Sequence, residues 1–441
     1  MRLAVLDTEK CIGCQSCMFA CSRRQGDAGL SQSCIGVRSI GGMERGFTVI
    51  VCKACYDPPC AKVCPTQALT PRKGGGVHLD ADKCIGCGYC RDACIIGAVF
   101  WDDEINKPEG VRGKGNNFYN LFQFCRDAEA KVTIVVDADL RSITPEWIQY
   151  LGYPIKDGED FVTPLYSRHQ FDATITNHLC YPLVLSLARF DVRQPIGGDF
   201  AFSPRLCSYW LDQKWTDMTR QYGIDIFMSL NAVFGGFKIC ESGLGNKIHN
   251  ASSPKLGRMF EEVVYTLFST LLRYRHMWLE APLLENLPDI YRPEHRINRY
   301  GLEKMMEPQD LSIDIIGLKK QCRNEYEKYQ HLIKRYLSSY CYNRIHYMFM
   351  IDDYDLDTMI WSQIVYKFLF LFDGAEEETK QEIIDALKAL YFARSITFDY
   401  TTFRYSVNFA EAEVRNQSQA FLSQKPYLMG LYLSKGHKFK P

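Results

Sequence analysis

Hydrophobic residues recur at helical spacing in the last third of the chain. In two stretches they stand mostly three or four residues apart, which places each set on one face of an α-helix. The positions are Tyr326, Tyr329, Ile333 and Leu337, then Ile383, Ile384, Leu387, Leu390 and Tyr391. Acidic residues at 376–382 precede the second stretch, where the helix dipole favours them. The pattern predicts a helical C-terminal domain over residues 276–441, with a role in packing or in homo-oligomer contacts.

Two continuous apolar runs predict further elements. The longer one, residues 360–372, contains Ser, Gln and Lys and is too short to cross a bilayer, so we expect a buried helix and no membrane span. The other run is rich in β-branched residues and ends in Asp137-x-Asp139. It predicts a buried parallel strand that delivers two carboxylates to the mouth of an α/β sheet. On its own, such a pair is more often a solvated strand end than a binding site.

Composition narrows the number of domains and the kinds of partner that the chain can have. The chain has 441 residues, 46% of them hydrophobic, which is enough for two or three domains with proper cores. Basic and acidic residues balance at 52 each, so no nucleic-acid partner is expected. The first residues lack a basic segment followed by a long apolar stretch, and we expect a soluble cytoplasmic protein without a signal peptide. In such a protein, 19 cysteines indicate metal ligation rather than a disulfide scaffold.

Twelve of these cysteines form three groups of four near the start of the chain. The first and third groups have the spacing C-x2-C-x2-C-x3-C, and the second is longer by two residues in its middle. Thiolates on such tight loops hold three corners of a [4Fe–4S] cluster, while the fourth cysteine reaches another cluster. Zinc is the alternative for C-x2-C pairs, but three complete groups favour iron–sulfur. The groups are Cys11, Cys14, Cys17 and Cys21; Cys52, Cys55, Cys60 and Cys64; and Cys84, Cys87, Cys90 and Cys94.

This segment resembles the multi-cluster ferredoxin subunits that pass electrons to tungsten or molybdenum oxidoreductases. "CIGCQSCMFAC", "VCKACYDPPCAKVCPTQAL" and "DKCIGCGYCRDACIIGAVFW" carry the resemblance. It implies an α+β ferredoxin-like domain over residues 1–108 and a redox enzyme as partner. The implied ligand sets are Cys52, Cys55, Cys60 and Cys94 for one cluster, and Cys64, Cys84, Cys87 and Cys90 for the other. The first group lacks the downstream group with which it would exchange ligands, so the number of clusters stays open between two and three, the third completed by Cys21 or Cys34.

A second ordered set of motifs follows between residues 110 and 275. The motifs are "GVRGKGNN" at 110–117, "VVDADLRSITPEW" at 135–147, "TITNHL" at 174–179, "RQPIGGDFAF" at 193–202, "YGIDIFM" at 222–228 and "ESGLGNKIH" at 241–249. The ordered set resembles retaining GT-A glycosyltransferases of the mannosylglycerate synthase and glucosyl-3-phosphoglycerate synthase kind. It implies an α/β GT-A domain over residues 109–275. If active, this domain is a hexosyltransferase with a nucleotide-sugar donor and a small acceptor of the glycerate or phosphoglycerate type.

The resemblance assigns roles around the donor diphosphate. Asp137 and Asp139 would bind the nucleotide diphosphate and, together with His249, a Mg²⁺ or Mn²⁺ ion. Hard oxygen ligands suit such an ion, which would neutralise a diphosphate leaving group. Lys114 would contact a phosphate, although a glycine turn that opens a helix explains most of its motif.

It also assigns roles around the transferred sugar and the acceptor. Asp199 would hydrogen-bond sugar hydroxyls, at a position where the family often has Glu, and Asp225 would be the second acid at the transfer site. Thr176 and Asn177 would contact the acceptor, or alternatively cap and begin an ordinary helix. Two glycines would let the backbone approach the donor sugar closely. These glycines are Gly197 and Gly198.

The two modules are each cut where they meet, at "INKPEG", residues 105–110. A GT-A domain begins with strands and helices that form its nucleoside pocket, and this half is missing here. We therefore predict a ferredoxin-like iron–sulfur module joined to an incomplete GT-A domain with a helical extension, and the strand before Asp137 at or near a sheet edge. Three functions stay open: a metal-dependent glycosyltransferase attached to an electron-transfer module, an iron–sulfur carrier with an inactive transferase remnant, or a non-functional fusion.

Overall fold

The computed structural model divides the chain into two compact units, Met1–Glu109 and Gly110–Pro441. The predicted domain boundary after residue 108 lies one residue from this division. Residues 276–441, predicted as a domain of their own, are part of the second unit. The structure describes residues 18, 21, 23, 33, 35–39, 47–51, 54–80, 83–84, 89–94, 113–137, 140–248, 256–279, 297–305, 307–308, 311 and 313–436.

The described part of the first unit contains small antiparallel sheets and short helices. Strands β1 and β2 pair with each other, and so do β3 and β4. Helices α2 and α3 pack against each other, and α2 begins at a proline, which the first turn of a helix tolerates. These elements are β1 (Ile35–Ser39), β2 (Phe47–Val51), α2 (Pro59–Lys62), β3 (Leu69–Pro71), β4 (Val77–Leu79) and α3 (Tyr89–Asp92).

A mixed sheet organises the first half of the second unit. Among the described residues it has five strands in the order β5-β7-β6-β8-β9. Strand β8 runs parallel to β6 and to β9, whereas β7 is antiparallel to β5 and to β6. The strands are β5 (Thr133–Val135), β6 (Phe161–Ser167), β7 (Phe200–Phe202), β8 (Ile239–Asn246) and β9 (Asn298–Tyr300). This mixed sheet with helices agrees with the predicted α/β class.

The strand that leads to Asp137 corrects one prediction and confirms another. β5 is half-buried and pairs antiparallel with β7, so the prediction of a buried parallel strand is wrong. Within the described residues β7 is its one partner, so β5 lies at a sheet edge, as predicted. The edge position accounts for the partial exposure, because a strand that lacks one neighbour stays partly exposed, and the direction is set by the pairing with β7.

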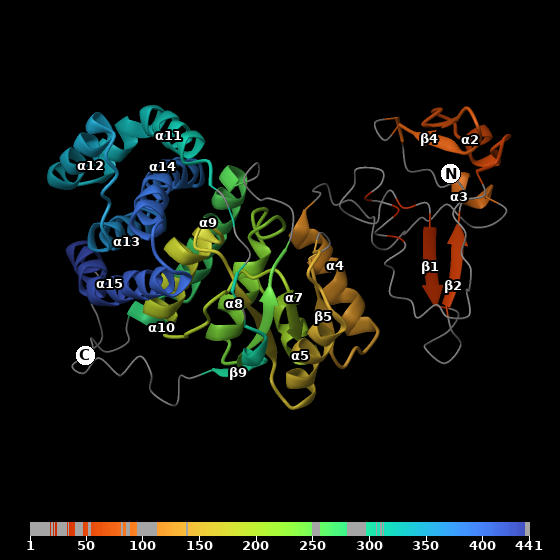
Figure 1. The fold of residues 1–441 in the computed structure, drawn as a ribbon, viewed down its shortest axis with the longest axis horizontal. Helices are drawn as coiled ribbons and strands as arrows, with labels where there is room; N and C mark the ends of the chain where they lie inside the picture. The colour runs from red at the N-terminus through yellow and green to blue at the C-terminus, as the bar shows by residue number, and fades with distance from the viewer. Residues whose placement is uncertain are drawn as a thin grey trace. The chain divides into compact units, whose positions relative to one another are not determined.

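Helices flank the sheet and then form a region of their own. Figure 1 shows α11 to α15 gathered beside α9 and α10, and helices α13 and α14 both contact α9. The segment after β6 continues as π-helical and α-helical turns. The helices are α4 (Lys114–Asp127), α5 (Pro145–Lys156), η4 (Thr176–Cys180), α6 (Tyr181–Leu183), η5 (Val184–Ala188), α7 (Pro204–Leu211), α8 (Ile224–Phe234), α9 (Leu256–Arg273), α10 (Arg275–Leu279), η8 (Leu302–Lys304), α11 (Ile315–Tyr336), α12 (Ser339–Ile351), α13 (Thr358–Asp373), α14 (Glu377–Thr402) and α15 (Val407–Ser434).

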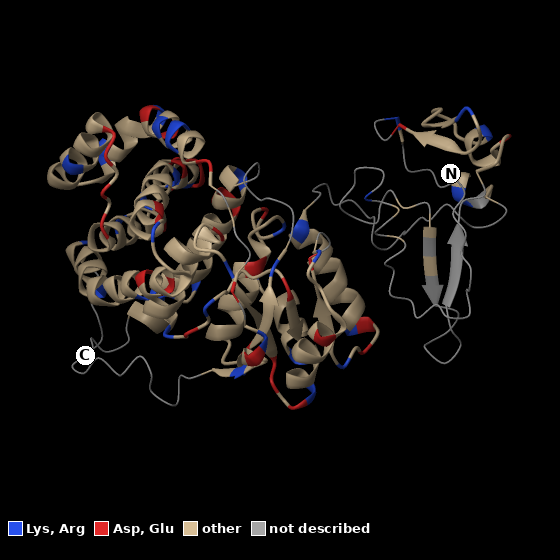
Figure 2. Ribbon diagram, viewed as in Figure 1, with Lys and Arg blue, Asp and Glu red and all other residues tan. Residues whose placement is uncertain are grey.

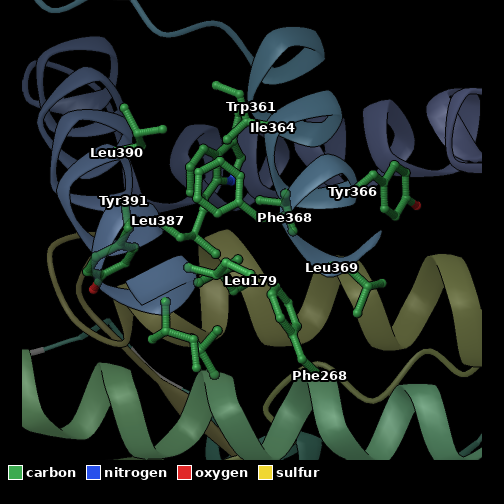
Figure 3. Packing of buried hydrophobic residues seen from close by; sticks show 14 of the residues in the cluster. Leu179, Phe268, Trp361, Ile364, Tyr366, Phe368, Leu369, Leu387, Leu390 and Tyr391 are labelled. Atoms are coloured by element: carbon green, nitrogen blue, oxygen red, sulfur yellow. The ribbon is translucent and has the colours of Figure 1, made fainter. Parts of the chain in front are cut away.

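One hydrophobic core joins the helical region to the segment that follows β6. Figure 3 shows side chains of α13 and α14, among them Trp361 and Leu387, packed around Leu179 of η4 and Phe268 of α9. The apolar run at 360–372 lies in α13 and is largely buried, as predicted. Because the helices after residue 315 share this core with η4 and α9, they do not bury a separate core of their own.

Charges of both signs alternate along the helices of the second unit (Figure 2). Figure 2 shows Lys and Arg interspersed with Asp and Glu along the helices of the second unit. In the part of the chain that the structure describes, none of the helices has both the length and the apolar character to cross a membrane.

Candidate functional site

Three carboxylates and two lysines meet beside the sheet of the second unit. Asp137 follows β5 and Asp199 precedes β7, and these two strands pair antiparallel with Val135 opposite Phe200, which brings the two aspartates together. Lys247 follows β8, Lys114 is the first residue of α4, and Asp225 lies in the first turn of α8. We call Lys114, Asp137, Asp199, Asp225 and Lys247 the charge cluster.

Lys247 is the buried centre of this cluster. Its Nζ donates to Asp137 Oδ2, Asp199 Oδ2 and Gly197 O, each at 2.7 Å. Its side chain is 4% exposed. An ammonium group has three N–H donors, so these contacts use all of them. Lys247 therefore fixes the ends of β5 and β7 against the end of β8.

Asp199 is fully buried, and hydrogen bonds occupy both its oxygens. Oδ1 accepts from the backbone N–H of Asp137 at 2.7 Å, and Oδ2 accepts from Lys247 and from the hydroxyl of Tyr166. Burial, together with the Asp199 carboxylate, raises the pKa of Tyr166 well above its ordinary value, so this hydroxyl stays a donor. The carboxylate predicted to bind sugar hydroxyls thus supports Asp137 and Lys247 in this structure.

Lys114 and Asp225 form the more accessible side of the cluster. Lys114 Nζ lies 2.9 Å from Asp225 Oδ2 and 3.2 Å from Asp137 Oδ1, and its side chain is 21% exposed. Asp225 is 8% exposed, and its buried Oδ1 has no hydrogen-bond partner among the described residues. Asp225 therefore offers an acceptor atom to a bound hydroxyl, whereas both oxygens of Asp199 are engaged.

Burial and charge pairing set the protonation of the cluster. Burial alone would raise the pKa of Asp137, but Lys114 and Lys247 hold it below its ordinary value. Burial raises the pKa of Asp225 by more than Lys114 lowers it. Burial alone would lower the pKa of Lys114, yet Asp137 and Asp225 raise it. Asp137 and Lys114 are therefore ionised at neutral pH, and Asp225 is the carboxylate that accepts a proton more readily than an ordinary aspartate.

The two predicted glycines are explained by packing within the chain. Gly198 has φ +93°, and a Cβ added there would lie 2.2 Å from Asp137 Oδ2. A Cβ on Gly197 would lie 2.2 Å from Pro164 Cγ. A side chain at either position would displace the carboxylate or the strand beside it.

The residues predicted to contact the acceptor lie inside the protein. Thr176 and Asn177 are 4% and 5% exposed and belong to η4. Ile175 before them is already helical, so the alternative of a helix cap does not apply. Asn177 Oδ1 accepts from Arg193 at 2.9 Å, and Arg193 also pairs with Glu411 of α15 at 2.7 Å. Asn177 therefore lies in a polar network that ties the sheet region to the last helix.

Sequence reasoning missed three residues that organise the site: Lys247, Tyr166 and Arg193. Two of them stood inside motifs that were already recognised, "ESGLGNKIH" and "RQPIGGDFAF". A basic residue in each motif, next to the acids that were singled out, was the available signal. Tyr166 had no such signal, because its role depends on β6 lying beside β7.

Of the three residues predicted to bind a divalent cation, the structure describes one, Asp137. Asp139 and His249 lie outside the described residues. Both oxygens of Asp137 face ammonium groups, and the described His, Cys, Asp and Glu side chains form no group of three that could hold a metal ion. The described residues alone therefore do not make a metal site, and the donor set of Asp137, Asp139 and His249 stays a prediction.

Apart from Cys21, the described cysteines of the first unit lie in or near α2 and α3 in sequence. Cys60 lies in α2 and Cys90 in α3, and the packing of these helices brings their turns together. A hydrogen bond with the Leu69 backbone lowers the pKa of the Cys64 thiol, which favours the thiolate that iron requires. Cys84 is exposed, and the other described ligands are partly buried. The predicted ligands outside the described residues are Cys11, Cys14, Cys17, Cys34, Cys52 and Cys87.

The first unit carries an iron–sulfur module of the [4Fe–4S] ferredoxin class. Residues 77–100, which include the third cysteine group, match the family model of the 4Fe-4S binding domain. This match confirms the iron–sulfur prediction and leaves the number of clusters open.

The curated relatives agree with this class. The chain is 36% identical over 129 residues to a putative dimethyl sulfoxide reductase iron–sulfur subunit of Halobacterium salinarum, covering 25% of this chain and 49% of that protein. It is 40% identical over 104 residues to a selenate reductase subunit of Mesobacillus selenatarsenatis, covering 23% and 36%. A tetrathionate reductase subunit of Salmonella typhimurium is 36% identical over 106 residues, covering 23% and 42%. The chain thus spans half or less of the length of these relatives.

Solved structures also resemble part of the chain. Glucosyl-3-phosphoglycerate synthase of Mycobacterium tuberculosis, in complex with Mn²⁺, uridine-diphosphate-glucose and phosphoglyceric acid, is 23% identical and covers 36% of this chain and 55% of its own, with a TM-score of 0.31. Its complex with phosphoglyceric acid alone is 24% identical and covers 38% and 58%, with a TM-score of 0.32.

Proposed function

We propose that the second unit transfers a sugar from a nucleotide-sugar donor to a small acceptor of the glycerate or phosphoglycerate type, with the help of a divalent cation. The charge cluster carries this proposal. Its partly exposed Lys114 stands between two carboxylates beside strand ends, where α/β sheets bind their ligands. An ammonium group at such a place is suited to the oxygens of a diphosphate. The ordered motifs between residues 110 and 249 support the same reading.

Each residue of the cluster then has a distinct task. Lys114 binds a diphosphate oxygen, while Lys247 and Asp199 keep Asp137 in place. The bond between the sugar carbon and the diphosphate oxygen breaks, and a bond from that carbon to the oxygen of an acceptor hydroxyl forms. The proton of this hydroxyl passes to the oxygen of the leaving nucleoside diphosphate. Asp225 accepts a hydrogen bond from a hydroxyl at this centre through its Oδ1, which has no partner among the described residues. A Mg²⁺ or Mn²⁺ ion held by Asp137, Asp139 and His249 would supply positive charge to the leaving diphosphate.

We expect this activity to be low. The sheet ends at β5 in the described structure, directly beside Asp137, so strands that would line a nucleoside pocket are not supplied on that side by the described residues. The donor then makes its diphosphate contacts without the full set of contacts to its base and ribose.

The test is binding and turnover of UDP-glucose with phosphoglyceric acid in the presence of Mn²⁺. We expect weak binding and slow turnover in the wild type, both lost in Lys114→Met, whereas Arg126→Met, a change of an exposed residue on the same helix, leaves both unchanged. Binding of inorganic pyrophosphate serves as a second readout that does not require turnover. If neither ligand binds, or if Lys114→Met binds them as well as the wild type does, the proposal fails.

A second function is carried by the first unit. We infer that its [4Fe–4S] module passes electrons to a redox enzyme, as expected from its likeness to iron–sulfur subunits of reductases. Reduction of the bound clusters by dithionite, followed by visible and electron-paramagnetic resonance spectroscopy, tests whether the module is redox-active. Clusters that cannot be reduced and reoxidised would contradict an electron-carrier role.

A further inference from the structure

The segment between β6 and η4 lies along helix α14 and is tied to it at two points. Gln170 Nε2 donates to Thr402 O at 3.0 Å, and the hydroxyls of Thr174 and Tyr391 are 2.5 Å apart. These contacts come from residues more than two hundred positions apart in sequence, as their separations of 232 and 217 show. They hold the segment that leads into Thr176 and Asn177 against the helical region.

Between these two points, polar side chains of α14 and of η4 lie near each other, and some of their buried polar atoms form no hydrogen bond with the described residues. Both carboxyl oxygens of Asp399 and the Nε2 of His178 are buried, and none has a hydrogen-bond partner among the described residues. Ser395 and Asp399 follow Tyr391 at successive steps of four residues, so the three share one face of α14. The His178 ring lies on the same face, 5.0 Å from the ring of Phe398 and 6.4 Å from that of Tyr391. We call Thr174, His178, Tyr391, Ser395 and Asp399 the polar joint.

The charged group that acts electrostatically on Asp399 is Arg394, from its own helix. Arg394 is directed elsewhere: its Nε donates to Gln417 of α15 at 2.8 Å and its Nη1 to Leu356 O at 2.9 Å. Acidic residues of neighbouring elements raise the pKa of Arg394. Burial lowers it by more, to about 10. These acids are Glu413 of α15 and Asp355 and Asp357 at the start of α13.

The two titratable groups of the joint are both favoured in their neutral forms. Burial raises the pKa of Asp399 to about 7, because Arg394 offsets only part of the desolvation. Burial, followed by repulsion from Arg394, lowers the pKa of His178 well below its ordinary value. An ionised carboxylate without a partner is costly in such a place, whereas the neutral acid has a donor and an acceptor to offer.

We propose that the polar joint is a pH-sensitive switch, in which loss of the proton from Asp399 loosens α14 from the segment at residues 170–178. The neutral acid is compatible with the closed contact. The carboxylate is not, because no described hydrogen-bond donor reaches either of its oxygens. Opening lets water reach the charge, and it frees the segment that carries Thr176 and Asn177.

The sign of the pH dependence follows from the raised pKa. Below the ordinary value near 3.8 Asp399 is protonated in both the closed and the opened state, so it contributes no pH dependence there. Between that value and about 7 the closed state holds one proton more than the opened state, so rising pH favours opening by about tenfold per pH unit. Above about 7 both states are ionised and the dependence ends.

Hydrogen–deuterium exchange of the full-length protein tests this proposal. Protection factors, which are corrected for the intrinsic pH dependence of exchange, are measured for peptides covering residues 391–403 and 170–180. The wild type is compared with Asp399→Asn and Asp399→Leu, two uncharged variants, so the comparison survives if one of them does not fold. Glu382→Gln, an exposed acid on the same helix, is the control.

We expect the protection of an uncharged variant relative to the wild type to rise by about tenfold per pH unit from about pH 5 to about pH 7 and then to level off. The Glu382→Gln control should follow the wild type throughout. Parallel pH profiles for the wild type and an uncharged variant would overturn the proposal. So would a relative protection that falls with pH.

Discussion

Lys247 contacts three separate parts of the chain through one ammonium group. It joins Asp137 after β5, Asp199 before β7, and Gly197 in the turn that leads into β7. Removing one partner of a buried ion pair leaves the other charge uncompensated, which costs more than the pair contributes. The stability of the sheet end is therefore expected to depend on Lys247 more strongly than on surface ion pairs.

Lys247→Met should lower the free energy of unfolding of the second unit by about 3–5 kcal/mol, because Asp199 and one oxygen of Asp137 lose their cation. Chemical denaturation followed by tryptophan fluorescence measures the change. Arg126→Met is the control: Arg126 and Asp127 are 51% and 72% exposed, and their pair should contribute about 0–1 kcal/mol. Equal losses in the two variants would contradict the central position of Lys247.

The predicted metal ligands can be separated by substitution. Mn²⁺ should bind weakly to the wild type, and Asp139→Ala and His249→Ala should each abolish this binding, because each removes a donor of a small set. Electron-paramagnetic resonance of free Mn²⁺ measures the bound fraction without an activity assay. Unchanged Mn²⁺ binding in Asp139→Ala would remove this residue from the site.

At the residue scale the sequence predicted part of the cluster. Asp137, Asp225 and Lys114 lie together in the structure. They could be singled out beforehand because each stands in a motif that is recognisable without coordinates. The buried role of Asp199 was not predictable, since it depends on Lys247 and Tyr166 arriving from β8 and β6. A motif identifies residues that act together, but it does not tell which of their atoms are already bonded to one another.

At the scale of elements, two neighbouring helices begin in different ways. At α13 the Asp357 carboxylate accepts from the backbone N–H groups of Met359 and Ile360, both at 2.9 Å. At α14 the corresponding residue, Glu376, forms no such side-chain cap. The first N–H groups of a helix have no partner inside it, so the side chain before α13 satisfies two of them.

Asp357→Ala should destabilise the second unit by about 0.5–2 kcal/mol through loss of this cap. Glu376→Ala is the matched control and should have a smaller effect, because no cap hydrogen bond is lost there. Asp357→Asn should retain most of the stability, since its amide oxygen can accept the same hydrogen bonds. Thermal unfolding of the three variants measures the differences. A larger loss for Glu376→Ala than for Asp357→Ala would contradict the cap assignment.

Helices were predicted better than strands for a physical reason. The spacing of Ile383, Leu387 and Leu390 predicts a helix from local periodicity alone, although α14 is in fact buried on all sides from Ala386 to Asp399. Strand β5 has three residues, and its direction relative to its neighbour is fixed by β7, about sixty-five residues later in the chain. The run of β-branched residues alone does not determine which strand will pair with it or in which direction.

At the scale of the whole molecule, the chain combines two compact units with different chemistry. The iron–sulfur module was predictable in kind from cysteine spacing, because the chemistry demands ligands at short fixed intervals. The count of clusters was not predictable, since the first cysteine group lacks its expected partner group.

Protein prepared without oxygen should contain about eight iron atoms and as many labile sulfides, from two complete ligand sets, or about twelve if a third cluster forms. Iron and acid-labile sulfide assays measure both. Replacing Cys90 with Ser should lower the iron content, whereas Cys207→Ser, a change of a buried cysteine in α7, should leave it unchanged. Zinc without labile sulfide would contradict the cluster assignment.

The open edge of β5 has a consequence for handling the protein. Within the described residues, no strand pairs with the outer side of β5. Backbone N–H and C=O groups on such an edge can accept a strand from another molecule, and natural sheets usually protect such edges with charges, bulges or a covering element. Here Val136, directly after the strand, is 38% exposed. We therefore expect shelf life to be limited by turbidity that grows with protein concentration well below the melting temperature. Dilute storage should preserve the sample better than added salt, because salt screens charges and leaves the edge open.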